Sequence, residues 1–178
     1  MALRDAAGQG PLTLVLGGAR SGKSRYAEWL IASSRPPWIY IATAEAMDDE
    51  MAERITAHRA RRDAGWRTVE APHDLAGALA AIPAGSVVLV DCLTLWLSNR
   101  MLAEADMDQE IEHLETVLSK LDGAVVLVSN EVGLGIVPDN ALARRFRDQQ
   151  GILNQRLAAR ATRVVMMVAG LLVPVKSP

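Results

Sequence analysis

The residues with the clearest chemical potential form a glycine-rich run near the start of the chain. Gly17 is followed by four variable residues and then by Gly22-Lys23-Ser24, the spacing of a loop that binds phosphate. Glycines let the backbone N–H groups converge on phosphate oxygens, and the helix that follows adds its positive N-terminal end. The apolar run at residues 12–16 supplies the strand that this motif requires. We therefore expect the chain to bind a nucleoside triphosphate, with Lys23 at the β- and γ-phosphates and the Ser24 hydroxyl on Mg²⁺.

A second candidate is Asp91, which ends the apolar run at residues 86–90. A carboxylate at the C-terminal end of a buried strand can hold Mg²⁺ or its bound waters beside a phosphate loop. The same pattern also fits a plain strand-end cap or turn, because hydrophobic runs often end in aspartate. With the loop upstream, we predict a Mg²⁺ site that uses Ser24 and Asp91. Every loop residue is a predicted nucleotide contact: Gly17, Gly18, Ala19, Arg20, Ser21, Gly22, Lys23 and Ser24.

One of the three histidines stands apart from the other two. His58 shares a helical stripe with Met51 and Ile55, and arginines follow it directly: Arg59, Arg61 and Arg62. A neutral imidazole among arginines can attack phosphorus, because the arginines disfavour its protonation and stabilise the transferred group. Spacing alone favours a half-buried structural histidine, so both interpretations stay open on the residues themselves. His73 and His113 are most simply surface residues.

The elements expected to position these residues alternate between strand and helix. The predicted strands are residues 12–16, 38–42, 66–70, 86–91, 124–129 and 163–169. The predicted helices are residues 23–34, 48–62, 74–81, 93–102, 106–121 and 140–162. This alternation predicts a P-loop NTPase-like α/β fold, a mainly parallel sheet with helices on both faces. Residues 171–175 contain Pro174 and suit an antiparallel C-terminal edge strand. In the last helix, Leu142, Phe146, Leu153 and Leu157 are expected to face inward.

Bulk composition limits the classes of protein that the chain can belong to. Its 178 residues, half of them hydrophobic, predict a single domain over residues 11–178 after a flexible segment at residues 1–10. A net charge of −2 gives no electrostatic case for a nucleic-acid partner, and no apolar run approaches membrane-spanning length. The single cysteine, Cys92, excludes an intramolecular disulfide and fits a reducing compartment, here the cytoplasm. We expect Cys92 itself to be a buried, inert thiol.

The residues also narrow the use made of a bound triphosphate. A GTPase switch should show an Asn-Lys-x-Asp run, and the chain has none. DNA-translocating or protein-unfolding ATPases are larger or more basic, so the size favours a small-molecule kinase. In such an enzyme catalysis is mostly positioning and charge neutralisation, with Arg20 and Lys23 as natural cations. The alternatives are a kinase without nucleotidyl transfer and a regulatory nucleotide-binding module without chemistry.

Several runs together resemble one known family. They are residues 17–25, 40–43, 48–52, 66–70, 129–138 and 154–158. The runs Asp48-Asp49-Glu50-Met51 and Asn130-Glu131-Val132-Gly133 are far more specific than the phosphate loop alone. The chain resembles the bifunctional adenosylcobinamide kinase / adenosylcobinamide-phosphate guanylyltransferase family of cobalamin biosynthesis, over nearly its whole length after Gly10.

The resemblance implies a two-step enzyme that works as a homotrimer. ATP or GTP first phosphorylates a hydroxyl of adenosylcobinamide, and GMP from GTP then passes through a histidine to the phosphorylated corrinoid. The guanylylated histidine of the family falls on His58. Beyond the loop, the nucleotide contacts implied by the resemblance are Ala42, Thr43, Ala44, Arg59, Ala60, Arg61, Arg62, Glu70 and Asp91. The family often has glutamate where this chain has Asp91, which keeps the carboxylate but shortens its reach.

Overall fold

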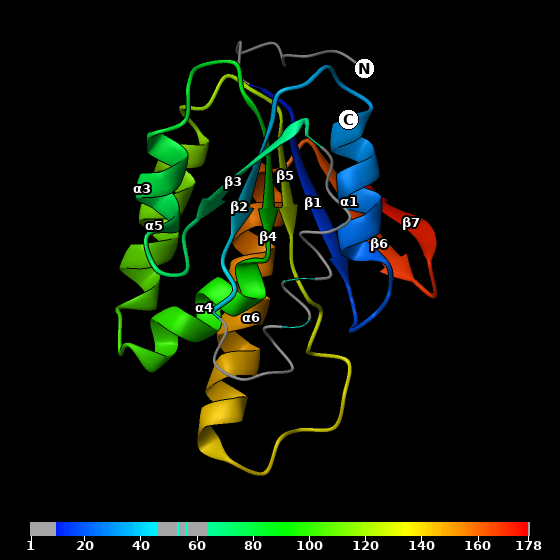
Figure 1. Ribbon diagram of the computed structural model, residues 1–178. Helices are drawn as coiled ribbons and strands as arrows, with labels where there is room; N and C mark the ends of the chain where they lie inside the picture. The colour runs from blue at the N-terminus through cyan, green and yellow to red at the C-terminus, as the bar shows by residue number, and fades with distance from the viewer. Residues whose placement is uncertain (1–9, 46–52, 54–55, 57–63, 178) are drawn as a thin grey trace.

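The fold is built on one sheet of seven strands that carries helices on both faces, as the alternation of elements predicts (Figure 1). The computed structural model describes residues 10–45, 53, 56 and 64–177. Residues 1–9, which hold nearly all of the predicted flexible segment, lie outside this description. So does the predicted helix at residues 48–62, apart from residues 53 and 56.

The strands run parallel except at one edge. Their bounds are β1 Leu12–Gly17, β2 Trp38–Ala42, β3 Trp66–Glu70, β4 Val87–Asp91, β5 Val125–Val128, β6 Arg163–Val168 and β7 Leu171–Lys176. They lie in the order β3-β2-β4-β5-β1-β6-β7, and only the β6–β7 pair is antiparallel. The predicted antiparallel edge strand is confirmed, and Pro174 is tolerated there because β7 has one strand neighbour. The order also places β5 between β1 and β4, so the phosphate loop and Asp91 end strands that are not adjacent.

Side-chain caps start several of the helices. The described helices are α1 Lys23–Ala32, α3 Leu75–Ala80, α4 Leu93–Leu102, α5 Met107–Leu118 and α6 Ala141–Arg160. Asp74, Asp106 and Asn140 each accept hydrogen bonds from backbone N–H groups in the first turn of α3, α5 and α6, which satisfies donors that the helix leaves unpaired. The predicted caps at Asp74 and Asn140 are confirmed. Within the described residues, no helix is both long and apolar enough to cross a bilayer.

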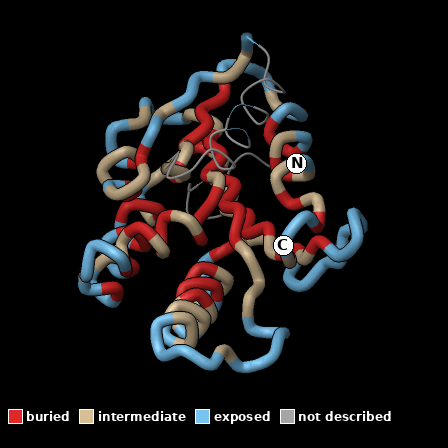
Figure 2. The backbone as a smooth tube through the Cα atoms, turned by 60° about the horizontal axis from the view of Figure 1, so that its bottom comes forward, coloured by how far each residue is buried: buried red, intermediate tan, exposed pale blue. Residues whose placement is uncertain are grey.

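The hydrophobic core has two layers, because alternate residues of each strand face opposite sides of the sheet. In β4, Val88 and Val90 pack with α3, α4, α5 and α6, whereas Leu89 packs on the face covered by α1. Figure 2 shows the buried strands at the centre of the molecule, with exposed residues on the outer helix faces and on the long loop after β5. One predicted inward residue is wrong: Leu142 is 56% exposed, because it lies in the first turn of α6, beyond the edge of the sheet.

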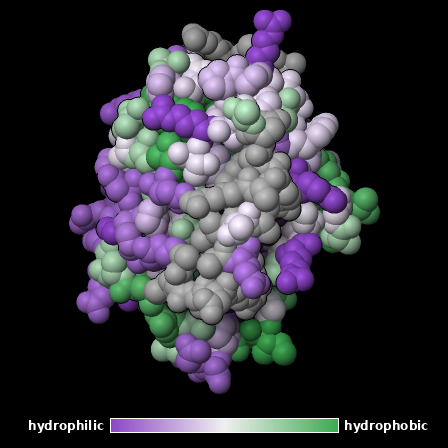
Figure 3. Space-filling model, in the orientation of Figure 1, coloured by the Kyte–Doolittle hydropathy of each residue, from purple (hydrophilic) through white to green (hydrophobic). Residues whose placement is uncertain are grey.

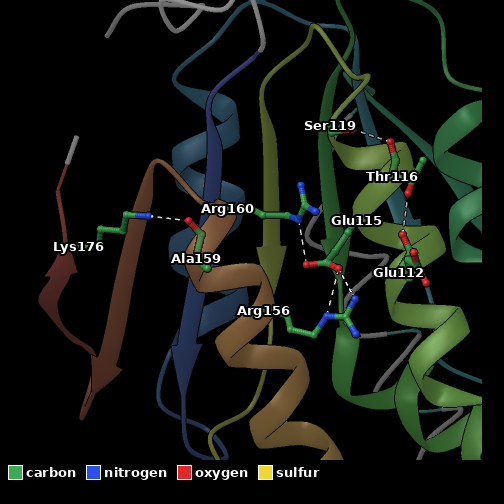
Figure 4. Close-up of polar contacts among 8 residues, drawn as sticks. All are labelled: Glu112, Glu115, Thr116, Ser119, Arg156, Ala159, Arg160 and Lys176. Atoms are coloured by element: carbon green, nitrogen blue, oxygen red, sulfur yellow. Dashed lines mark hydrogen bonds and ion pairs between the residues drawn. The ribbon is translucent and has the colours of Figure 1, made fainter.

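An ion-pair cluster joins α5 to α6 on the helical layer opposite α1 (Figure 4). Glu115 is buried and accepts hydrogen bonds from Arg156 and from Arg160, whose Nε lies 2.9 Å from Oε1. Burial alone would raise the pKa of Glu115, but the two guanidinium groups outweigh it and lower that pKa overall. The cluster therefore locks two helices together and lies away from the phosphate loop.

Apolar side chains also lie exposed in two places on the surface. Figure 3 shows hydrophobic atoms over β7, at one side of the molecule, and over the loop that follows β5. Leu171 and Val175 of β7 are largely exposed, as are Leu134 and Ile136 of the loop.

Candidate nucleotide-binding site

The phosphate loop has the backbone that its glycines predict. Gly17 ends β1 with φ +150°, and a Cβ there would lie 2.5 Å from the carbonyl oxygen of Met167. Gly22 caps α1 in the left-handed conformation, with φ 96°. Arg20 also has a positive φ of 54°, which a residue with a side chain adopts at some energetic cost, and such costs concentrate at functional loops. The loop therefore holds a shape that most sequences could not.

Lys23 is drawn into this loop. Its Nζ donates a hydrogen bond to the Gly18 carbonyl at 2.6 Å, and the residue is only 7% exposed. Burial lowers the pKa of Lys23, and the nearby Asp91 carboxylate opposes part of that effect. The Ser21 hydroxyl is buried in the same loop without a hydrogen-bond partner among the described residues. A lysine and a serine that point into a glycine turn are suited to an anion.

Asp91 ends β4 at the same edge of the sheet. Its Oδ2 accepts a hydrogen bond from the Tyr40 hydroxyl at 3.1 Å, which fixes the carboxylate. The other oxygen accepts no hydrogen bond from the described residues, and the Ser24 hydroxyl likewise makes none with them. Both are hard oxygen donors of the kind that Mg²⁺ prefers, so the predicted ligands fit that ion. Across the described residues, no cluster of three or more His, Cys, Asp or Glu side chains could hold a metal by itself.

The loops after β2, β3 and β4 are tied together by buried hydrogen bonds. The Thr43 hydroxyl accepts from the Cys92 amide at 2.8 Å and donates to the Cys92 carbonyl at 2.7 Å. The Asn99 side chain in α4 donates to the carbonyls of Thr43 and Pro72, both at 3.0 Å. The structure therefore brings Ala42 to Ala44 to the predicted edge, but it uses the Thr43 side chain for structure. Glu70 is the last residue of β3 and pairs in register with Ala42.

The loop after β5 is pinned by a second polar network. Asn154 of α6 donates to the Asn130 carbonyl at 3.0 Å and accepts from the Ser129 hydroxyl at 2.7 Å. Gln150 donates to the same Ser129 oxygen, and the Thr94 hydroxyl accepts from the Asn130 amide at 2.8 Å. The Glu131 amide then donates to the Gly17 carbonyl at 3.0 Å. This loop thus begins directly beside the phosphate loop.

Sequence reasoning missed these supporting residues. Tyr40 lies in a wholly apolar run and carries no signal for its contact with Asp91. Asn99, Gln150 and Asn154 could have been noticed, because each is a polar side chain at an inward helical position among apolar neighbours. The prediction for Cys92 is confirmed, since the thiol is buried and burial raises its pKa to about 12.

The remaining predicted residues cannot be placed. His58 and the residues Arg59, Ala60, Arg61 and Arg62 lie outside the described part of the chain. His113 is exposed on α5, as predicted. His73 is partly buried, and its Nε2 lies 3.2 Å from Glu45 Oε1, so it supports the loop after β2.

A parallel sheet with a glycine-built phosphate loop, a buried loop lysine and a strand-end aspartate defines a P-loop nucleotide-binding protein. Two solved structures show the same fold at low sequence identity. The flagellar accessory protein FlaH of Methanocaldococcus jannaschii superposes with a TM-score of 0.53 at 12% identity, over 94% of this chain and 78% of that one. A Pyrococcus horikoshii protein gives 0.55 at 10% identity, over 96% and 87%.

Sequence comparison identifies the family. Residues 13–175 match the family described as cobinamide kinase / cobinamide phosphate guanyltransferase, and the chain belongs to it. The bifunctional adenosylcobalamin biosynthesis protein CobP of Pseudomonas aeruginosa is 53% identical, over 92% of this chain and 96% of that protein. The corresponding CobU proteins of Salmonella typhimurium and Escherichia coli are 43% and 44% identical, each over 93% of this chain and 99% of its own length.

Proposed function

We propose that this chain phosphorylates adenosylcobinamide and then attaches GMP to the phosphate, giving adenosylcobinamide-GDP. The observation that carries the proposal is the phosphate loop with its buried Lys23, in a chain that belongs to this family. In the first step the corrinoid hydroxyl attacks the γ-phosphorus of ATP or GTP. The bond from that phosphorus to the β-phosphate oxygen breaks, the hydroxyl proton is released, and the nucleoside diphosphate leaves.

The second step moves GMP through His58. An imidazole nitrogen attacks the α-phosphorus of GTP, and pyrophosphate leaves. A phosphate oxygen of adenosylcobinamide phosphate then attacks the same phosphorus, so the phosphorus–nitrogen bond breaks and a diphosphate linkage forms. Covalent transfer of this kind divides one difficult displacement into two.

The loop residues have separate roles in both steps. Lys23 exchanges its hydrogen bond with the Gly18 carbonyl for a phosphate oxygen, and a charge held in a partly dry site stabilises the developing negative charge strongly. Tyr40 holds the carboxylate of Asp91 toward the loop. Ser24 and Asp91 would hold Mg²⁺, which neutralises charge on the phosphates when it is bound. Ala42 to Ala44, Glu70 and the Arg59 to Arg62 segment would contact the guanine nucleotide.

The decisive experiment uses GTP labelled at the α-phosphate. We expect acid-labile label on the wild-type protein and on His113→Ala, a matched control at an exposed histidine, and none on His58→Ala. Label that persists on His58→Ala would remove this residue from the mechanism. A kinase without nucleotidyl transfer would leave the wild type unlabelled, and a regulatory module would also turn over no corrinoid.

A second variant tests the phosphoryl-transfer step alone. Lys23→Ala should abolish phosphorylation of adenosylcobinamide, because the loop would lose its only buried cation among the described residues. Retained kinase activity would contradict the role given to the loop.

We further propose that the enzyme works as a homotrimer in the cytoplasm. The family resemblance supports the trimer, and the single reduced cysteine suits a reducing compartment. Light scattering on the purified protein should give three times the chain mass of 19.2 kDa.

A further inference from the structure

An open depression lies beside the phosphate loop, on the side away from Asp91. Its volume is about 280 Å³, and it is lined by Gly22, Arg25, Tyr26, Trp29, Met167 and Gly170. Ligand pockets in proteins measure roughly 300–1,000 Å³, so this one suits part of a nucleotide rather than a whole cofactor. Gly22 belongs both to the depression and to the loop, and the Gly170 amide donates to the Ser21 carbonyl at 3.0 Å. The two sites are therefore continuous.

The lining is aromatic and incompletely satisfied. The rings of Tyr26 and Trp29 lie 5.8 Å apart between centroids, inclined by 32°, and Trp29 is 63% exposed. The Tyr26 hydroxyl is buried but has no hydrogen-bond partner among the described residues. A buried hydroxyl normally finds a partner. A flat ligand with polar edges would cover the indole and could satisfy the hydroxyl.

The position of the depression in the sheet indicates which part of a nucleotide reaches it. Met167 and Gly170 belong to β6 and its turn into β7, and β6 lies on the opposite side of β1 from β5 and β4. A triphosphate whose terminal phosphate faces Asp91, at the end of β4, must therefore direct its nucleoside toward β6. Base and terminal phosphate leave the loop in opposite directions.

We propose that the depression beside α1 binds the purine base of the nucleotide that donates its γ-phosphate, with Trp29 as the stacking surface. This inference rests on the proposed phosphoryl transfer in the loop. Aromatic stacking accepts any base, because every base has a π-face, and the Arg25 guanidinium can add a cation–π contact. A subsite of this kind does not choose between adenine and guanine, which accounts for a kinase step that uses ATP or GTP.

The same reasoning separates the two nucleotides of the reaction. The residues proposed for the guanine nucleotide, Ala42 to Ala44 and Glu70, end β2 and β3, beyond β4. A GTP bound there would direct its α-phosphate toward the β4 side of the loop, whereas the phosphoryl donor directs its γ-phosphate that way. One loop would thus hold triphosphates in two opposite orientations, and each would present its reacting phosphorus on the same side.

The test compares ATP with inorganic tripolyphosphate, which fills the loop but has no base. Calorimetry on the full chain should show Trp29→Ala binding ATP about 5- to 150-fold more weakly, the range for loss of one stacked base. Tripolyphosphate affinity should not change, and Trp29→Phe should retain most of the ATP affinity. In the kinase assay, Trp29→Ala should raise KM for ATP far more than it lowers kcat. Leu102→Ala, at an exposed residue of α4, should match the wild type.

Each other outcome has a distinct meaning. Unchanged ATP affinity in Trp29→Ala overturns the base subsite, as does an equal loss for ATP and tripolyphosphate, which would place the effect in the loop. If Trp29→Ala changes the mass found by light scattering while ATP affinity stays normal, Trp29 belongs to a subunit contact and the inference is wrong. If the wild type binds neither ATP nor tripolyphosphate, the proposed function fails first.

Discussion

The sharpest test of the phosphate loop compares its two adjacent glycines. A Cβ added at Gly17 would lie 2.5 Å from the Met167 carbonyl oxygen and 2.6 Å from Ser21 Oγ, on a backbone with φ +150°. A Cβ added at Gly18 would meet nothing within 4 Å, and the φ of that residue is ordinary for a side chain. The pair therefore separates backbone geometry from mere loss of glycine at nearly the same place.

The expected loss of stability follows from these contacts. Holding a residue with a side chain in such a conformation costs about 1–3 kcal/mol, and crowding against backbone that cannot move adds about 1–3 kcal/mol. Gly17→Ala should therefore lose roughly 2–5 kcal/mol in free energy of unfolding. For a domain of this size each kcal/mol lowers Tm by about 2–4 °C. Gly18→Ala should stay within about 1 kcal/mol of the wild type and could be slightly more stable, because alanine restricts the unfolded chain.

Urea unfolding and thermal melts, each with and without tripolyphosphate, measure both effects. The wild type and Gly18→Ala should gain stability with the anion, as linkage requires for a ligand of the native state, and Gly17→Ala should gain much less. Equal Tm values for the two variants would show that the backbone at Gly17 is not constrained as described, and the account of the loop would fall with it.

Three further predictions concern the residues that support the site. Glu115→Gln should lower the free energy of unfolding by about 1–3 kcal/mol at pH 7. Because the folded pKa of Glu115 is lowered, the difference should vanish as the pH falls from the ordinary carboxyl pKa through that lowered value; urea titrations at several pH values would show this, with the more exposed Glu110→Gln as control. Cys92, with a pKa of about 12, should resist thiol reagents at pH 8 in the native protein and react quickly in urea; rapid native labelling would contradict its burial. Asn99→Ala should cost about 1–3 kcal/mol by leaving the buried Thr43 carbonyl without its donor, and a loss below about 0.5 kcal/mol in urea unfolding would rule out that role.

The sequence predicts the elements well, because their signals are local. The phosphate loop, the strand before Asp91, the helix caps and the edge strand with Pro174 all depend on residues within a few positions of one another. Leu142 shows the limit of such patterns, since helical spacing identifies a stripe but does not say where the sheet beneath it stops. The order of the strands has no local signal at all. No short pattern reveals that β5 separates β1 from β4, and the distance from the loop to Asp91 depends on that order.

The supporting hydrogen bonds were harder to foresee for a related reason. Asn99 and Asn154 join segments 56 and 24 residues away along the chain, and a polar residue in a helix gives no sign of a partner so distant. Burial makes these bonds consequential, because a buried amide or carbonyl without a partner costs more than the bond itself contributes.

The arrangement of these supports constrains how the two reactions share one site. Asn99 and Thr94 of α4 and Asn154 of α6 reach the loops after β2, β3 and β5 from one face of the sheet. The phosphate loop instead continues into α1, which covers the other face. A bound triphosphate would therefore lie between a loop carried by α1 and a rim held by α4 and α6. The depression beside Trp29 belongs wholly to the α1 side, and the ends of β2 and β3 belong to the rim. Because two different supports hold the two nucleoside positions, a substitution at Trp29 should affect phosphoryl transfer and leave the loading of GMP nearly intact.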